Sequence, residues 1–592
     1  MCQVATRGRT IERWLAVLAV CTLSASAQTR LDWRSLGNLT IADAASAGPA
    51  SGPIDRVWYG SDGRLFAHAF SGKTFETRDF ETWAEVSAAN PPPSADAVRR
   101  FGATFYTLDG ALLRSDDSGQ TWRNLTDFRN SSILGGPPTD LAVSAADLND
   151  ISVATGAGVW RSLDGGLSWN SLNLALPNFP AARILSPPSA GRSGLRVALA
   201  DGREAVWAPG ERKGWRLQQA SSPRRDLVVL GGFVYAGAPD GRLLSSTDGG
   251  NTWREFQTPD AARVVVFHVD PREPQIALAV LEGRGAQILR TTNGGIFWDD
   301  LTANLPKSGT RGIAADLASG AVYAATSTGV YMTLANLRNA APATAWQRID
   351  GGLPAASAFD AALDAGADQL YVALEGYGIW RTLAPHRLAD PRVVNAADFA
   401  RREAAPGSLL SVLGSKVASA KMGETEVPIL GASETESQIQ VPFEATGNQL
   451  SLRLNGRPID LPLRPVAPAI FIDRDGAPMI LDAERGILLD AQMTATGGSR
   501  IQILATGLGR VTPEWPSGLA APMEAPPSVN VPITVFLDRV PLQVTRATLA
   551  PGYVGFYLVE AELPAVVNPG PAELFLQAEG AESNRVTLYL QP

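Results

Sequence analysis

Hydrophobic and polar residues alternate in short runs along the first two-thirds of the chain, and no long stretch there shows the 3.6-residue period of a helix. A typical pair of runs is 151–155 followed by 158–162. Asp-Gly dipeptides, which favour tight hairpins because both residues tolerate positive φ, separate such runs at 109–110, 201–202 and 240–241. The pattern predicts an all-β region built from short antiparallel strands.

Tryptophans recur at nearly regular intervals through the same region. The intervals are roughly 40–50 residues, the length of one four-stranded repeat unit. A lone four-stranded sheet is a poor folding unit, so the pattern predicts repeats that bury their faces against one another. The tryptophans are Trp83, Trp122, Trp169, Trp215, Trp253, Trp298 and Trp346.

Three of these tryptophans end an eight-residue motif of the form Ser-x-Asp-x-Gly-x-Thr/Ser-Trp. An Asp carboxylate can accept backbone hydrogen bonds from the following residues, Gly supplies positive φ, and the hydroxyls bond locally. We therefore expect a tight turn before a strand that opens with a buried indole. Divergent copies span 77–83 and 291–298. The shared residues are Ser115, Asp117, Gly119, Trp122, Ser162, Asp164, Gly166, Trp169, Ser246, Asp248, Gly250 and Trp253.

The motif resembles the Asp-box, or BNR repeat, of sialidase-like β-propellers. In that family the box joins the third and fourth strands of each blade, on the rim away from the ligand-binding face. The resemblance implies that residues 28–388 form a single β-propeller and that the boxes are structural.

Both ends of the repeat region predict a closed ring. Residues 31–36 read as a fourth strand with no blade before it, and residues 378–382 read as a third strand with no box after it. The N-terminal strand would then complete the last blade, which removes exposed sheet edges. Counting Trp33 predicts eight blades, with seven as the alternative if residues 352–383 are irregular.

The last 200 residues or so change in pattern and contain a faint duplication of short alternating strands. They predict two small Ig-like β-sandwiches, at 389–468 and 469–592. The segment resembles a C-terminal domain common in large exported acidobacterial proteins, which implies an accessory module with no known chemistry. Asp398 stands where that family favours Ser. The resemblance rests on residues 393–399, 405–408, 467–471, 506–509, 550–555 and 583–584.

The N-terminus has the pattern of a secretory signal peptide. Arginines precede a short apolar run, and residues 25–27 match a small-x-small cleavage site, so cleavage is predicted after Ala27. Lipid attachment at Cys21 is the alternative. Both cysteines, Cys2 and Cys21, lie in this segment, so the mature chain would contain none and would be secreted, periplasmic or at the cell surface. No other segment is long and apolar enough to be a predicted membrane span.

Charge and motif searches exclude several classes of function. The net charge of −8 and the pI near 5.2 argue against nucleic acid and anionic membranes as partners. The three histidines are far apart and fit no metal spacing, so no metal and no cofactor is expected. Residues 473–476 read as a hairpin turn rather than a calcium loop. The arginine cluster and the early Phe/Tyr-Arg-Ile-Pro motif of sialidases are missing, and no catalytic residue is assigned.

One set of charged residues is predicted to line the mouth of the central channel. Each lies at the start of the innermost strand of a blade, where arginine forks suit carboxylates and sugars. Ion pairing between blades is the other interpretation of the same set. The residues are Asp55, Arg56, Arg99, Asp140, Arg183, Asp226, Arg263, Arg311 and Asp360.

Three functions fit these observations. The first is an exported, non-enzymatic propeller that serves as a binding or assembly scaffold for an unknown glycan or protein ligand. The second is a divergent propeller glycoside hydrolase or lyase, and two carboxylates among the 59 acidic residues would then be catalytic. The third is a structural cell-surface protein attached through its C-terminal module.

Overall fold

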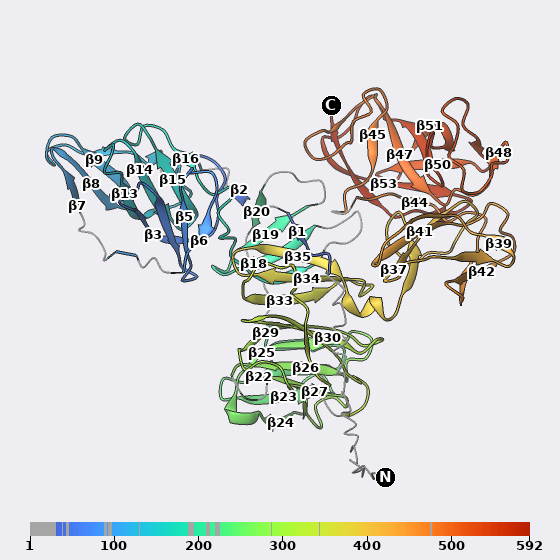
Figure 1. The fold of residues 1–592 in the computed structure, drawn as a ribbon, viewed down its shortest axis with the longest axis horizontal. Helices are drawn as coiled ribbons and strands as arrows, with labels where there is room; N and C mark the ends of the chain where they lie inside the picture. The colour runs from blue at the N-terminus through green and yellow to red at the C-terminus, as the bar shows by residue number, and fades with distance from the viewer. Residues whose placement is uncertain are drawn as a thin grey trace, which may run out of the picture.

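Repeated four-stranded sheets form the first two-thirds of the computed structural model (Figure 1). The described residues between 34 and 383 contain eight such antiparallel sheets, which we number 1 to 8 in the order of their innermost strands. The structure describes residues 31–592 except 38–39, 43–45, 88–90, 93–97, 129–130, 188–193, 209–213, 219–224, 284, 286, 342–343 and 474–475.

The strands of the first four sheets, from the innermost outward, are as follows. Sheet 1 contains β3 (Ile54–Tyr59), β4 (Leu65–Ala69), β5 (Thr74–Thr77) and β6 (Ala84–Glu85). Sheet 2 contains β7 (Val98–Phe101), β8 (Thr104–Asp109), β9 (Ala111–Ser115) and β10 (Arg123–Asn124). Sheet 3 contains β13 (Pro138–Val143), β14 (Ile151–Thr155), β15 (Gly158–Ser162) and β16 (Asn170–Ser171). Sheet 4 contains β17 (Ala181–Ser186), β18 (Leu195–Leu199), β19 (Glu204–Trp207) and β20 (Trp215–Gln218), with β2 (Ile41–Ala42) added parallel to β20.

The other four sheets have the same design. Sheet 5 contains β21 (Leu227–Leu230), β22 (Phe233–Gly237), β23 (Arg242–Ser246) and β24 (Arg254–Gln257). Sheet 6 contains β25 (Val264–Val269), β26 (Ala277–Leu281), β27 (Ile288–Thr291) and β28 (Asp299–Asp300). Sheet 7 contains β29 (Thr310–Asp316), β30 (Ala321–Thr326), β31 (Gly329–Leu334) and β32 (Gln347–Arg348). Sheet 8 contains β33 (Ala358–Leu363), β34 (Gln369–Leu374), β35 (Gly378–Leu383) and β1 (Arg34–Leu36).

The all-β class and the role of the N-terminal strand are confirmed. Two 3₁₀ turns, η1 (Pro259–Ala261) and η2 (Pro385–Leu388), are the helical elements among the described residues. Strand β1 pairs antiparallel with β35, with Arg34 opposite Arg381. The predicted signal peptide lies outside the described residues. Within the part of the chain that the structure describes, no helix is long and apolar enough to span a bilayer.

The repeated turn has the predicted hydrogen bonds, as the copy between β15 and β16 illustrates. Asp164 Oδ1 accepts hydrogen bonds from the Leu167 and Ser168 backbone N–H groups, both at 2.9 Å, and Asp164 Oδ2 accepts one from Ser168 Oγ at 2.6 Å. The Ser168 hydroxyl is the largest cause of the lowered pKa of Asp164, which falls to about 2. Gly165 and Gly166 have φ of 71° and 93°, which glycine adopts without strain. The Asp164 carboxylate therefore stabilises the backbone of its own turn, which is consistent with a structural role.

One contact joins neighbouring sheets repeatedly. The indole Nε1 of a tryptophan that opens one fourth strand donates to a backbone carbonyl beside the fourth strand of the preceding sheet. The acceptor is in each case the third residue after that sheet's own tryptophan. The bonds are Trp169 to Leu125 at 3.1 Å, Trp346 to Leu301 at 2.9 Å, and Trp33 to Ile349 at 3.2 Å. Each of these pairs joins consecutive sheets of the chain.

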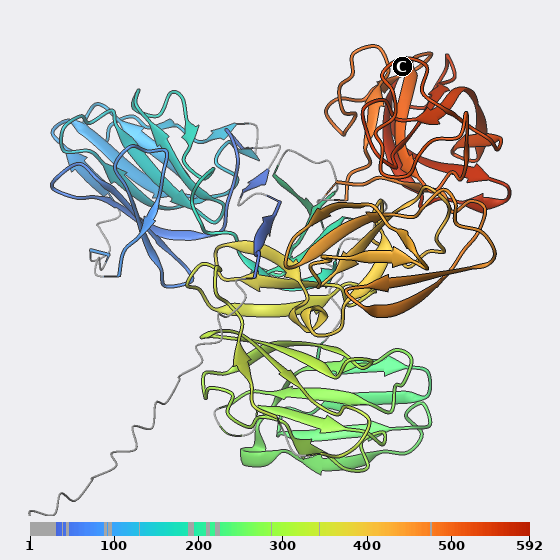
Figure 2. The same cartoon turned by 45° about the vertical axis from the view of Figure 1, so that its right-hand side comes forward.

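Two sheets pack against a sheet that is not adjacent to them in the chain, and this corrects the predicted single ring. Trp83 of sheet 1 donates to Leu172 O of sheet 3 at 2.8 Å, and the cores of these two sheets are shared. Trp215 of sheet 4 lies against Gly37, just beyond β1 of sheet 8. The sheets therefore pack in the orders 2–3–1 and 5–6–7–8–4 (Figures 1 and 2). Because Leu125 and Leu172 present equivalent carbonyls and accept from indoles of different sheets, the contact does not determine which sheets become neighbours.

The two sheets that begin these stacks leave their tryptophans uncovered. Trp122 is 40% exposed and Trp253 is 45% exposed, so the expectation of a buried indole is wrong at both positions. Sheets 1 and 4, which precede them in the chain, are packed elsewhere. Trp169, Trp298 and Trp346, whose preceding sheets are in place, are less than a tenth exposed.

The C-terminal third forms two further β-structures. Residues from two facing four-stranded sheets share the first core, which includes Val412, Ile439, Leu452 and Leu454. Its strands are β36 (Arg392–Asn395), β37 (Leu409–Leu413), β41 (Glu436–Gln440) and β40 (Ile429–Ala432) in one sheet, and β39 (Thr425–Glu426), β38 (Ala420–Met422), β42 (Gln449–Leu454) and β43 (Arg457–Pro462) in the other.

The second C-terminal structure is built around one long sheet path. Its main strands are β44 (Ala469–Ile470), β47 (Arg500–Thr506), β52 (Tyr557–Glu562), β51 (Val540–Leu549), β50 (Ile533–Leu537), β53 (Gly570–Ala578), β55 (Val586–Gln591) and β46 (Ala495–Thr496). Phe471 and Phe556 stack at 4.3 Å within a small cluster that also holds Leu409, so this structure packs against the first. An Ig-like assignment of the two structures stays a prediction.

Candidate functional site

The nine charged residues predicted at a channel mouth are divided between two buried centres and the surface. In sheet 3, Asp140 of β13 accepts hydrogen bonds from Arg56 Nε at 3.0 Å and from the Val57 backbone N–H at 2.9 Å. Arg99 of sheet 2 pairs with the other oxygen. Asp140 is 4% exposed, so this first centre ties three innermost strands together rather than facing solvent.

The second centre surrounds Asp360 of β33. Its carboxylate accepts hydrogen bonds from the Ile184 backbone N–H at 3.0 Å and from Arg225 Nη2 at 2.6 Å. Burial raises the pKa of Asp360, while Arg225 acts in the opposite direction. An added Cβ at Gly312 would lie 2.4 Å from Asp360 Oδ1, which explains the glycine there. Sequence reasoning named Asp226 but missed the adjacent Arg225, whose side chain makes the contact.

The remaining predicted residues are spread over several environments, although Arg183 and the Arg311 carbonyl lie beside Arg225 of the second centre. Asp55 pairs with His68 Nδ1 at 2.7 Å, and Arg263 lies 4.0 Å from Glu282 on the exposed surface. The Arg311 guanidinium lies over the Phe359 ring at 4.6 Å. Burial and then the nearby Arg225 lower the pKa of Arg183, and the Asp226 carbonyl accepts a hydrogen bond from the Gly237 backbone N–H at 2.8 Å. Most of these contacts of the nine predicted residues therefore join neighbouring strands and sheets to one another.

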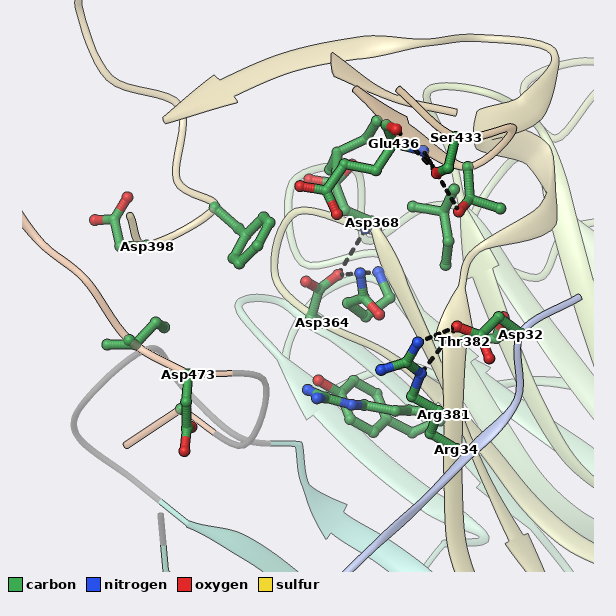
Figure 3. A pocket seen from close by; sticks show the side chains of 18 residues that line it. Asp32, Arg34, Asp364, Asp368, Arg381, Thr382, Asp398, Ser433, Glu436 and Asp473 are labelled. Atoms are coloured by element: carbon green, nitrogen blue, oxygen red, sulfur yellow. Dashed lines mark hydrogen bonds and ion pairs between the residues drawn. The ribbon is translucent and has the colours of Figure 1, made fainter. Parts of the chain in front are cut away.

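A different cavity lies where sheet 8 meets the C-terminal structures, and we call it the seam cavity (Figure 3). Its volume is about 500 Å³. Six carboxylates, two guanidiniums and the side chains of Tyr371 and Phe399 are among the groups that line it. The charged residues are Asp32, Asp364, Asp368, Asp398, Glu436, Asp473, Arg34 and Arg381.

Asp364 is the most perturbed carboxyl group of the seam cavity. It lies in the turn between β33 and β34, where its Oδ1 accepts hydrogen bonds from the Asp368 backbone N–H at 2.7 Å and the Gln369 backbone N–H at 3.0 Å. Among the described residues, no arginine or lysine forms an ion pair with Asp364. Burial therefore dominates and raises the pKa of Asp364 to about 6, with a further contribution from the negative charge of Asp368.

The other carboxylates of the seam cavity have partners. Asp368 pairs with Arg387 Nε at 2.9 Å, and Asp398 accepts from Arg402 Nε at 2.7 Å. Glu436 Oε1 accepts a hydrogen bond from Ser411 Oγ at 2.8 Å. The cavity thus holds two carboxyl groups with raised pKa, the ion-paired Asp368 and Asp364, which has no ion-pair partner among the described residues. Such an arrangement can accept hydrogen bonds from hydroxyl groups and donate a proton.

Sequence reasoning missed the seam cavity. Asp364 and Asp368 belong to no repeated motif, and they meet Asp398 and Asp473 only because β34 and the C-terminal loops lie side by side. The predicted turn at 473–476 lies partly outside the described residues. At its ends the Asp473 backbone N–H donates to Ala477 O at 2.7 Å.

Beside the seam cavity, η2 carries a buried cluster of charged groups that joins sheets 7 and 8 to the C-terminal third. His386 Nδ1 lies 2.6 Å from Tyr323 OH, and His386 Nε2 lies 3.6 Å from Asp316. Arg387 is fully buried against Asp368. We call these five residues the junction cluster.

The junction cluster is expected to weaken in acid. Burial, followed by the positive charge of Arg387, lowers the pKa of His386 from 6.5 to about 4. The unfolded chain then binds more protons than the folded one between these values, so stability is lost as the pH falls from 6.5 toward 4, by up to about 3 kcal/mol. Urea unfolding of the wild type and of His386→Gln from pH 7 to 4.5 tests this. Equal pH dependence of the two proteins would contradict it.

Comparison with known proteins finds short sequence matches. No protein-family model matches the chain. The xyloglucanase Xgh74A of Acetivibrio thermocellus is 27% identical over 192 residues, which cover 30% of this chain and 20% of that protein. A xyloglucanase from a Paenibacillus species is 28% identical over 165 residues, which cover 26% and 14% of the two chains. The chain therefore spans a fifth or less of the length of these curated relatives.

Solved structures of β-propeller proteins also resemble the chain. YCF48 bound to D1 peptide is 16% identical and covers 60% of this chain and 98% of that chain, with a TM-score of 0.20. The GH74 xyloglucanase from Xanthomonas campestris is 19% identical and covers 62% and 60% of the two chains, with a TM-score of 0.23.

Proposed function

We propose that this chain is an exported scaffold of propeller-type repeats that binds a neutral glycan in the seam cavity. The observation that carries the proposal is a cavity of about 500 Å³ whose lining combines six carboxylates with Tyr371 and Phe399. The repeated turns are taken to be Asp-boxes, the first 27 residues to be a signal peptide, and the C-terminal third to be a pair of Ig-like sandwiches. The nine predicted channel residues serve as supports between sheets.

The chemistry of the seam cavity suits a sugar. Carboxylate oxygens accept hydrogen bonds from hydroxyl groups, and hydrogen bonds to a charged acceptor contribute about 1.5–3 kcal/mol each. Aromatic faces cover the apolar side of a sugar ring, as in other pockets that combine apolar walls with a few polar groups. The excess of carboxylates over guanidiniums disfavours acidic ligands.

Replacing Asp364 with asparagine is expected to weaken glycan binding and to stabilise the fold. The raised pKa of about 6, compared with 3.8 in the unfolded chain, means that ionisation at pH 7 opposes folding. Asparagine keeps an oxygen for the Asp368 and Gln369 N–H groups but carries no charge. We expect the free energy of unfolding at pH 7 to rise by up to about 3 kcal/mol. The affinity for oligosaccharides should fall by about tenfold or more.

Urea unfolding and titration with oligosaccharides selected on a glycan array measure the two effects. Asp240→Asn is the matched control, because Asp240 lies in an exposed hairpin turn and pairs with Arg242 far from the cavity. It should leave binding unchanged. A wild-type chain that binds no glycan, or an Asp364→Asn variant that binds as well as the wild type, would refute the proposal.

Glycoside hydrolysis is the second candidate function. The matches to xyloglucanases favour it, and so does a carboxyl group with a pKa of about 6, which is suited to donate a proton to a leaving group. Asp364 would be the acid, and the second carboxylate would come from Asp398, Glu436 or Asp473. Reducing-sugar release from xyloglucan and other β-glucans separates the two functions. An enzyme should lose activity as the pH rises above about 6 and in Asp364→Asn.

A further inference from the structure

A second cavity lies next to the seam cavity. Two residues that line it, Arg392 and Arg402, pair with Asp368 and Asp398 of the seam cavity. This second cavity has a volume of about 660 Å³ and lies between the start of β36, the loop at 401–403 and the two C-terminal structures. Three arginines line it, namely Arg392, Arg401 and Arg402, and we call it the arginine cleft. Its apolar wall consists of Pro391, Val393, Leu461, Pro462, Ala467 and Pro468.

Arg392 lines the arginine cleft and is held there by contacts with the turn between β33 and β34. Its Nη1 donates to Gly366 O at 2.6 Å and approaches Asp368 Oδ1 at 3.3 Å. Its Nε is buried and has no hydrogen-bond partner. Because this Nε is shielded from solvent, Arg392 contributes positive charge to the cleft rather than an accessible donor. Burial, followed by the positive charge of Arg387, lowers the pKa of Arg392, with Arg401 acting in the same direction.

The other two arginines also direct positive charge to the cleft. Arg401 is exposed, and among the described residues it forms no ion pair. Arg402 places Nε and Nη2 on Asp398, at 2.7 and 2.6 Å, which leaves its Nη1 with only a long contact of 3.5 Å to Glu582 O. Nη1 of Arg402 therefore remains available to a ligand.

The carboxylates at the rim of the cleft are already paired with arginines other than these three. Asp390 pairs with Arg387 at 3.1 Å, Glu403 with Arg464 at 3.2 Å, and Glu582 with Arg585 at 2.7 Å. Their charge is thus compensated locally. Arg392 and Arg402 are themselves paired with Asp368 and Asp398, so the guanidinium of Arg401 and the Nη1 of Arg402 are the donors that remain for a ligand.

We propose that the arginine cleft binds the oxyanion group of an acidic saccharide. Guanidinium forks bind carboxylate and sulfate oxygens through two parallel hydrogen bonds, and the proline-rich wall covers the carbon skeleton of a sugar ring. This site is separate from the seam cavity, where carboxylates predominate. The chain would then engage a neutral sugar unit on one side of the wall and an acidic unit on the other.

Calorimetric titration of the purified full chain at low salt tests this site. D-galacturonate, galactose and sodium sulfate are the probes. We expect galacturonate to bind at least tenfold more tightly than galactose, and Arg401→Gln to weaken galacturonate binding at least tenfold. Arg453→Gln, on the exposed side of β42, is the matched control and should bind as the wild type does.

Each outcome bears on the proposal. Sulfate that binds as tightly as galacturonate, with the same loss in Arg401→Gln, supports the oxyanion site and identifies a sulfated saccharide as its ligand. Galacturonate that fails to bind, that binds no better than galactose, or that binds Arg401→Gln as well as the wild type overturns it. The seam cavity is tested separately, because Asp364→Asn should leave galacturonate binding unchanged.

Discussion

Replacing Trp169 with alanine is expected to lower the free energy of unfolding by about 3–5 kcal/mol. The Trp169 indole is 7% exposed, and its Nε1 donates to Leu125 O at 3.1 Å across the interface between sheets 2 and 3. Alanine would leave a cavity between the sheets and an unpaired carbonyl. Urea unfolding followed by far-UV circular dichroism measures the effect.

Trp122→Ala is the matched control, because Trp122 ends the same motif one sheet earlier. Its indole is 40% exposed and donates to Gly119 O of its own turn at 3.1 Å. We expect a loss of no more than about 1 kcal/mol, the scale of exposed substitutions. Similar losses for Trp169→Ala and Trp122→Ala would mean that sheet 2 is covered by sheet 1 in solution, as the predicted ring requires, and would contradict the packing order 2–3–1.

The sequence predicts the repeating unit better than the assembly of the units. The turn around Asp164, the four-stranded sheets and the return of β1 to β35 all follow from local patterns, because hydrogen bonds within a few residues and the spacing of tryptophans determine them. The order of the sheets does not follow. Leu125 O and Leu172 O are equivalent hydrogen-bond acceptors in two different sheets. The contact between sheets therefore does not determine which tryptophan binds to which carbonyl.

The candidate site depends on contacts that local patterns do not encode. Asp364 and Arg387 lie 23 positions apart and belong to no motif, and the chemistry of each depends on burial at the junction with the C-terminal third. The same holds for Arg392. Its buried, unpaired Nε and its place in the arginine cleft depend on the three-dimensional packing of the chain and cannot be predicted from the sequence. Burial and neighbouring charges of the same sign determine the pKa values of these groups, and the burial arises from long-range packing.

Replacing Arg387 with methionine is expected to lower the free energy of unfolding by about 3–5 kcal/mol, because it leaves Asp368 buried without its nearest cation. Arg387 is fully buried, pairs with Asp368 at 2.9 Å, and donates to Ala367 O at 3.2 Å and Gly366 O at 3.1 Å.

The expected pH dependence distinguishes the loss of the Arg387 charge from a loss of side-chain packing. Methionine fills much of the same space, so the loss in Arg387→Met should shrink as the pH falls and Asp368 becomes protonated; its pKa is already raised by burial. Arg348→Met, which breaks an exposed pair with Asp350, is the control and should cost less than about 1 kcal/mol. A loss for Arg387→Met that is equally small, or that does not change between pH 7 and pH 4.5, would mean that the junction cluster does not depend on this charge. The binding of η2 to sheet 8 would then rest on its other contacts.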